Sequence, residues 1–195
     1  MDIHLIFILN SLSILAGSFA YIICSQPFFK DKSYTNVIIQ HYFNSNLVYL
    51  VVSPYLVQNT SEYHIVSWVV YPLSFELIYY IWHRILHLKL LYKYFHAHHH
   101  VNYIVYPMDF LDLDYIDNLG LVVGINLPVF WTPLNPHEYF MWYFAILFSG
   151  FLLHSNRFND HHVLHHRHFH CNYSFLLPVF DILFGTEHHH PQMRS

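Results

Sequence analysis

Histidines at metal-ligand spacings are the most informative feature of this sequence. The chain contains 20 histidines but only eight lysines and arginines combined. Residues 96–100 and 162–166 both contain the pattern H-x-x-H-H, and His83 and His87 stand four positions apart before the first copy. On an α-helix, residues i, i+3 and i+4 share one face. We therefore expect each triplet to direct three imidazoles at one point.

Three such groups could together hold two metal ions with nitrogen ligands alone. The candidate metal ligands are His83, His87, His96, His99, His100, His154, His162, His165 and His166. Neutral imidazole suits iron, zinc, copper and nickel, so ligand type does not select among these metals. Because imidazole must be deprotonated to bind, and its ordinary pKa is about 6.5, we expect metal content to fall as the pH drops below about 6.5.

The composition indicates that lipid surrounds part of the chain. Of 195 residues, 55% are hydrophobic and 10% are charged, whereas about 25% are charged in an average soluble protein. The net charge of -4 arises from few charges of either sign, which argues against a nucleic-acid partner. The two cysteines, Cys24 and Cys171, form neither a C-x-x-C motif nor a disulfide framework.

Four apolar segments are candidates for anchoring the histidines in a membrane. Residues 5–23 contain no charge and, at about 1.5 Å per residue, would cross a hydrocarbon core of about 30 Å. Residues 37–57 and 65–82 are a second and a third candidate span. Residues 119–153 predict a hairpin around a proline-containing turn, and its first arm, 119–131, suits a re-entrant segment as well as a span.

We therefore predict an all-α integral membrane protein with three to five transmembrane helices, in a single domain over residues 1–195. The basic residues would then all lie on one side of the membrane, which is the cytosolic side by the positive-inside rule. Residues 83–118 and 154–195 would form a cytosolic, histidine-rich helical cap that holds the dinuclear metal site.

Several stretches resemble the histidine boxes of the fatty acid hydroxylase and sterol desaturase superfamily. Y-Y-I-W-H-R-I-L-H at 79–87 and Y-K-Y-F-H-A-H-H-H at 92–100 resemble the first two boxes. H-H-V-L-H-H-R-H-F-H-C-N-Y at 161–173, followed by D-I-L-F-G-T at 181–186, resembles the last box with its closing signature. The resemblance covers roughly residues 65–187 and is nearest to the sterol methyl oxidase and cholesterol hydroxylase branch.

This resemblance implies a membrane-bound non-haem di-iron oxygenase that uses dioxygen to hydroxylate or desaturate a C–H bond of a sterol or fatty acyl lipid. The nine histidines named above match the family's boxes and would hold two iron ions, for which zinc could substitute in purified protein. Electrons would come from a b5-type cytochrome and an NAD(P)H-dependent reductase. A eukaryotic member would reside in the endoplasmic reticulum.

Four further residues are candidates for orienting the ligands or metal-bound water: His161, His170, Asn172 and Asp181. No catalytic residue beyond the metal ligands is assigned. The chain departs from the family at Ser174, where glycine is usual, and in the short bridge from His154 to His162. Two alternatives stay open: a histidine-rich membrane protein for metal transport or storage, and a catalytically inactive family member.

Overall fold

Helices make up all of the regular secondary structure in the described part of the chain. A computed structural model describes residues 3–24, 33–58, 65–155 and 160–188. The longer helices are α1 (Ile3–Cys24), α2 (Thr35–Gln58), α3 (Ser67–Leu86), α5 (Tyr115–Asn126) and α6 (Pro136–Leu153). The shorter elements are α4 (Lys89–Phe95), η1 (His99–Val101), η2 (Pro107–Leu111), η3 (Leu127–Phe130), α7 (Asp160–His168) and α8 (Val179–Phe184). The prediction of an all-α fold is confirmed.

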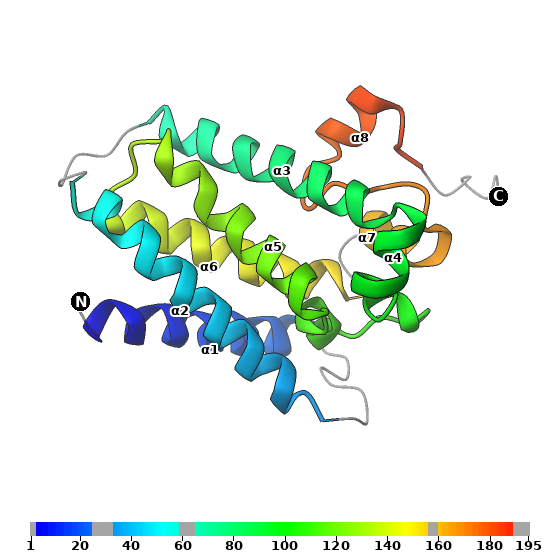
Figure 1. Cartoon of the computed structure of the whole chain (residues 1–195), viewed down its shortest axis with the longest axis horizontal. Coiled ribbons are helices and arrows are strands. Elements are labelled where there is room, and N and C mark those ends of the chain that lie inside the picture. Colours follow the sequence, from blue (N-terminus) through cyan, green and yellow to red (C-terminus); the bar gives the residue numbers. More distant parts are fainter. Residues whose placement is uncertain (1–2, 25–32, 59–64, 156–159, 189–195) are drawn as a thin grey trace.

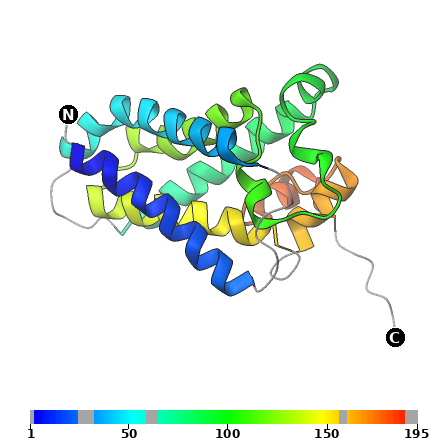
Figure 2. The ribbon, with the colours of Figure 1, turned by 90° about the horizontal axis from the view of Figure 1, so that it is seen from below.

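The long helices form an elongated body, and the short helices α4, α7 and α8 gather at one end of it (Figure 1). Both α3 and α6 run toward this end, whereas α5 begins there and leads away from it (Figure 1). Figure 2 shows the same separation from below. Because α3 and α6 end at this end of the molecule, the histidines at and just beyond their C-termini meet the histidines of the short elements.

Helices form over the predicted spans at 5–23, 37–57 and 65–82, and α5 and α6 form the predicted hairpin at 119–153. Among the described helices, however, none is both long enough and apolar enough to be assigned as a membrane crossing. The prediction of three to five transmembrane helices is therefore not supported by the helices themselves. Helix α2 also carries polar side chains toward its neighbours, since Asn44 donates to Asn118 Oδ1 at 2.8 Å.

Tyrosine hydroxyl groups join the long helices inside an aromatic core. Tyr71 of α3 donates to the carbonyl oxygen of Ile125 at 2.7 Å, and Tyr139 of α6 donates to Asn126 Oδ1 at 2.7 Å. Each ring is fully buried, so its hydroxyl group requires a partner inside the protein. These bonds fix α3 and α6 against the C-terminal end of α5.

Glu76 connects α3 to the segment that follows the second histidine triplet. Its carboxylate accepts hydrogen bonds from the backbone amides of three consecutive residues, Phe175 at 3.0 Å, Leu176 at 2.7 Å and Leu177 at 3.0 Å. Glu76 is 3% exposed, and a buried carboxylate is tolerated where donors surround it. Glu76 therefore holds the 175–177 segment against α3.

Replacing this carboxylate should loosen the 175–177 segment. Glu76→Gln keeps the side-chain size but turns one acceptor into a donor that faces backbone N–H groups. We expect the free energy of unfolding to fall by about 2 kcal/mol, the usual contribution of a hydrogen bond to a charged group. Amide hydrogen exchange should accelerate first at residues 175–177, and unchanged exchange there would contradict this role.

Candidate metal centre

Two adjacent clusters of histidine rings lie at the end of the molecule that carries α4, α7 and α8. The five-histidine cluster comprises His83, His87, His96, His100 and His165. The four-histidine cluster comprises His99, His154, His162 and His166. Within each cluster the possible ligand atoms all lie within 4.8 Å of one another. The two clusters are neighbours, since the ring centroids of His100 and His166 are 4.5 Å apart.

All nine candidate ligands from the sequence lie in these two clusters, although they are arranged differently from the expectation. His96 and His100 belong to the five-histidine cluster, whereas His99 between them belongs to the other cluster. The second triplet divides in the opposite sense, since His165 alone joins the five-histidine cluster. The prediction that each triplet converges on one point is therefore wrong.

Local backbone geometry explains the division of the first triplet. Helix α4 ends before His96, whose φ of -137° lies outside the helical range. His99 begins the short 3₁₀ turn η1, in which successive side chains are spaced more widely around the axis than in an α-helix. His99 and His100 therefore point toward different clusters. Their ring planes are inclined by 82°.

The distances between ring nitrogens fit a shared metal ion better than hydrogen bonds. His154 Nε2 lies 3.3 Å from His99 Nε2, 3.1 Å from His162 Nε2 and 3.3 Å from His166 Nε2. One ring nitrogen carries one proton or one lone pair, so it cannot satisfy three such partners. Two nitrogens that bind one ion at about 2.0–2.1 Å are separated by about 2.8–3.4 Å for bond angles from octahedral to tetrahedral. The three distances from His154 Nε2 fall in this range.

The five-histidine cluster shows the same feature together with two unpartnered nitrogens. His100 Nε2 lies 3.0 Å from His96 Nε2 and 3.2 Å from His165 Nε2. Within the described ranges, Nε2 of His83 and Nε2 of His87 are buried and have no hydrogen-bond partner. An unsatisfied buried polar atom is unfavourable unless a ligand binds it. Both clusters are therefore able to bind a metal ion, and the donor set alone does not identify the metal.

Backbone carbonyl groups orient three of the rings. Nδ1 of His83 lies 2.8 Å from the Tyr173 carbonyl oxygen, Nδ1 of His165 lies 2.7 Å from that of Cys171, and Nδ1 of His154 lies 2.9 Å from that of Gly150. A carbonyl oxygen only accepts, so Nδ1 carries the proton and donates it. Nε2 then keeps its lone pair for a metal ion, which is the usual arrangement of metal-binding histidine.

A carboxylate orients a fourth ring. Nδ1 of His96 lies 2.6 Å from Asp117 Oδ2, and both side chains are buried. Sequence reasoning assigned no role to Asp117. The signal that could have identified it is the group of four aspartates that follows the first triplet, because histidine ligands commonly donate to a carboxylate. Asp117 lies in the first turn of α5, the helix that begins beside the clusters.

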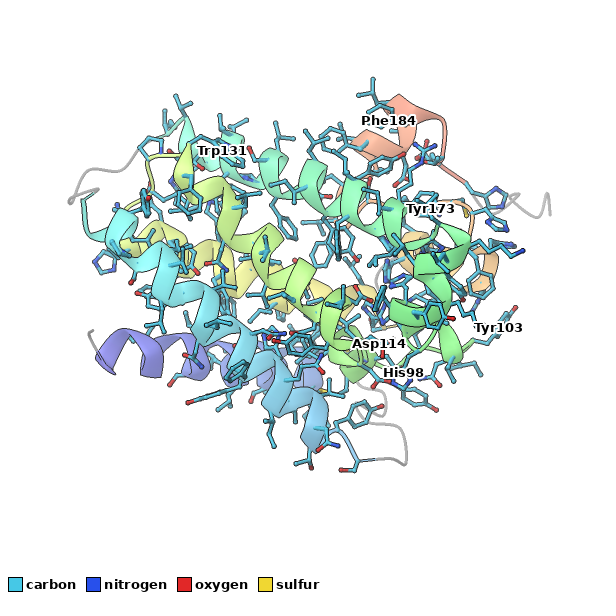
Figure 3. The ribbon with its side chains drawn as sticks, in the orientation of Figure 1. His98, Tyr103, Asp114, Trp131, Tyr173 and Phe184 are labelled. Atoms are coloured by element: carbon cyan, nitrogen blue, oxygen red, sulfur yellow. The ribbon has the colours of Figure 1, made fainter. Side chains whose placement is uncertain are left out.

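The predicted orienting residues Asn172 and Asp181 form hydrogen bonds that stabilise the turn which orients two of the rings. Asp181 accepts from the backbone N–H groups of Tyr173 and Ser174, both at 2.8 Å. Asn172 adopts a left-handed φ of 58°, and its side chain bonds to the backbone of His161 and of His188. These bonds fix the turn whose carbonyl groups hold His83 and His165. Figure 3 shows Tyr173 of this turn beside the end of α3.

The other two orienting candidates differ from each other. His161 Nε2 lies 3.2 Å from Asp181 Oδ2, so it supports the same turn. His170 is exposed and is not among the residues brought together at the clusters. Metal binding by the nine histidines, and the roles of these four residues, remain predictions.

Burial keeps the rings in the form that metal requires. Burial lowers the pKa of eight of the nine histidines below the ordinary value, because it removes the rings from water. In most of these rings, repulsion from neighbouring histidines lowers the pKa further. The pKa falls to about 3 for His87 and to about 4 for His154. Protons therefore compete with metal in the folded protein at lower pH than the sequence-based expectation of about 6.5.

Removing the charge of Asp117 should weaken the five-histidine cluster. Asp117→Asn keeps an acceptor near His96 Nδ1 but makes the ring a poorer donor to metal. We expect metal affinity of this cluster to fall about tenfold to a hundredfold, as measured by competition with a chelating indicator at pH 7. Asp114→Asn is the matched control, because Asp114 precedes the same helix without a side-chain capping bond. Equal affinity in wild type and Asp117→Asn would contradict this role.

A helical fold that brings two imidazole clusters together defines a candidate dinuclear metalloprotein. A profile of the fatty acid hydroxylase family matches residues 68–186, which is more than half of the chain. The chain therefore belongs to the fatty acid hydroxylase family. No solved structure matches the chain.

Several characterised proteins are similar to this part of the chain. It is 28% identical over 137 residues to Protein CER1-like 2 of Arabidopsis thaliana, covering 57% of this chain and 22% of that protein. It is 23% identical over 139 residues to the very-long-chain aldehyde decarbonylase CER1 of Arabidopsis thaliana, covering 57% and 21%. It is 28% identical over 120 residues to the Delta(7)-sterol 5(6)-desaturase ERG3B of Gibberella zeae, covering 55% and 37%. The chain thus matches well under half the length of each relative.

Proposed function

We propose that this chain is a membrane-bound non-haem di-iron oxygenase that hydroxylates or desaturates a C–H bond of a sterol or fatty acyl lipid. The observation that supports this most is the presence of two adjacent clusters with imidazole donors only, in a chain of the fatty acid hydroxylase family. Similarity to proteins named as aldehyde decarbonylases and as a sterol desaturase supports a lipid substrate. Within the family, the closing sequence around Cys171 favours the sterol methyl oxidase and cholesterol hydroxylase branch.

A small cavity beside both clusters suits this chemistry. It has a volume of about 10 Å³ and touches His83 and His96 of one cluster and His99 and His154 of the other. A cavity of this size holds about one water-sized molecule. When bound, a pair of iron ions would supply the reducing equivalents for dioxygen. The protein's part is to hold the imidazoles in their neutral form and to exclude bulk water, which prevents unproductive oxidation.

Aromatic and aliphatic side chains form the apolar part of the cavity wall. Trp82, Phe110, Leu113 and Leu121 line it together with the four histidines, and Tyr79 and Asp117 complete its wall. Phe110 is 3% exposed and Leu113 is 8% exposed. We propose that a substrate carbon reaches this cavity while water does not.

Three parts of the proposal concern the surroundings of the site. Electrons would come from a b5-type cytochrome and its NAD(P)H-dependent reductase. The apolar helices would associate with a membrane, in the endoplasmic reticulum of a eukaryotic cell, with the clusters on the cytosolic side. Exposed apolar side chains on α1 and α2, such as Ile14 at 72% and Val51 at 61%, support contact with lipid.

The alternative of metal transport is less well supported. A transport path requires ligands distributed along the protein body, whereas both clusters lie at one end of the helices (Figure 1). An inactive family member is also disfavoured, because the nine histidines that match the family's boxes are all present and converge in two clusters.

Metal analysis and lipid profiling test the proposed function together. We expect purified protein to contain two metal ions per chain, with iron supporting activity. Cells that express the chain should accumulate an oxygenated or desaturated lipid, and the substrate panel should include sterols, fatty acyl lipids and long-chain aldehydes. Less than one ion per chain and no altered lipid would overturn the proposal, and metal flux into vesicles would favour transport.

A further inference from the structure

A second and much larger cavity lies outside the metal centre. Its volume is about 620 Å³, which is within the range of small-molecule sites. It is bounded by α1, α2, the short turn η2 and one residue of α6. Figure 2 shows α1 and α2 diverging toward the end of the molecule that carries the clusters.

This cavity extends from the surface into the core. At its rim, Ile14 and Ile22 of α1 are 72% and 71% exposed. At its floor, Met108, Leu111 and Phe151 are each 6% exposed or less. Between Ile14 and Ile22 the cavity follows α1 for about 12 Å, given a rise of about 1.5 Å per residue.

The lining favours an uncharged apolar ligand. Among the described residues that line the cavity, none is an acidic residue, lysine or arginine. The one histidine, His41, is already bonded at both ring nitrogens, since Asn118 donates to its Nδ1 at 3.3 Å and its Nε2 lies 3.4 Å from Ser45 Oγ. This pattern is that of a neutral ring, and it leaves no cation to bind a charged group. A hydrocarbon chain matches this chemistry.

The floor of the cavity contacts the wall of the metal centre through one aromatic pair. Phe151 packs edge-to-face against Phe110, with ring centroids 5.3 Å apart. The Phe110 ring also lies 5.7 Å from the His154 ring, and it lines the small cavity beside both clusters. Because Met108 and Leu111 face the large cavity, the turn η2 separates the two cavities.

A glycine fixes the position of this separating ring. A Cβ atom at Gly150 would lie 2.3 to 2.6 Å from three ring atoms of Phe110, so a larger residue would displace the ring. Asp109, next to Phe110, is held by Tyr34, whose hydroxyl donates to Asp109 Oδ1 at 3.1 Å. Both contacts hold Phe110 between the large cavity and the metal centre.

We propose that the large cavity binds the hydrocarbon chain of a lipid and that Phe110 determines how far this chain reaches toward the metal centre. The inference rests on the proposed function for its lipid substrate. It goes beyond the family match, because α1 and α2, which form most of the cavity, precede the matched residues 68–186.

Photo-crosslinking of the metal-free full chain tests the binding site without relying on activity. The probe is a long-chain fatty alcohol with a diazirine in its chain, and labelled residues are mapped by mass spectrometry. We expect labels at Met108, Leu111 and Phe151. Gly17→Phe places a ring in the cavity and should reduce these labels at least tenfold, and Gly17→Leu should reduce them less. Leu15→Phe is the matched control, because Leu15 is exposed on the same helix and does not line the cavity.

Phe110→Ala and Gly150→Ala test the separating ring. Either change should allow a probe with its diazirine at the chain end to label Trp82 or Leu121, which line the small cavity. Labels spread evenly over exposed apolar residues, or an equal loss in Gly17→Phe and Leu15→Phe, would overturn the inference. If the cavity is labelled as expected but no variant oxidises a lipid, the proposed function fails and the binding site stands.

Discussion

Replacing His99 with alanine should abolish oxidation and remove metal from the four-histidine cluster. His99 is 4% exposed, and its Nε2 lies 3.3 Å from that of His154. Loss of one of four converging nitrogens removes a bond to the ion itself, so its effect should exceed the tenfold to hundredfold loss that is typical of residues around a metal site. Metal content per chain and product formation should fall together, with about one ion retained in the five-histidine cluster.

The neighbouring residue provides a matched control for this experiment. His98 differs from His99 by one position, but its side chain is 52% exposed and lies 3.1 Å from Asp112 Oδ1. Figure 3 shows His98 at the periphery of the histidine-bearing end, far from Trp131 at the opposite end. His98→Ala should retain both ions and most of the activity. Equal loss in His98→Ala and His99→Ala would show that the assignment of rings to clusters is wrong.

Mild acid should unfold the metal-free protein while leaving the metal-loaded protein folded. An unfolded histidine has its ordinary pKa of about 6.5, whereas eight of the clustered rings have lowered pKa values in the folded state. Below pH 6.5 the unfolded chain therefore binds more protons, and stability falls as the pH falls. Each such ring contributes up to about 1.4 kcal/mol per pH unit, so eight rings can exceed a net stability of about 5–15 kcal/mol.

The measurement is thermal unfolding at a series of pH values, with and without chelator. We expect the midpoint temperature of the metal-free protein to fall steeply between pH 6.5 and 5. The loaded protein should resist this change, because metal bound only to the folded state adds stability. Its metal should be released only at lower pH, because burial lowers the pKa of the ligand rings, to about 4 in His154, and protons then compete less well with the metal. A midpoint independent of pH in the metal-free protein would contradict neutral burial of the rings.

The sequence was sufficient to predict which histidines form the candidate metal centre. Spacing alone indicated His83 with His87 and the two triplets, and the structure brings these rings together with His154. The carbonyl partners of His83 and His165 were not predictable, because any backbone carbonyl can accept a hydrogen bond. The group of four aspartates indicated a carboxylate near the first triplet, but not that Asp117 is the one that contacts His96, because 21 residues separate these two residues in the chain.

The sequence by itself determined the all-helical fold, the family and the set of histidines, since these depend on local periodicity and on short motifs. Tertiary structure alone decided how the rings divide into five and four, because the division depends on where α4 ends and on how α3, α6 and α7 approach one another. It also decided the position of Phe110 between two cavities. The physical reason is that residue spacing fixes directions within one helix, whereas metal coordination requires distances between segments that only packing sets.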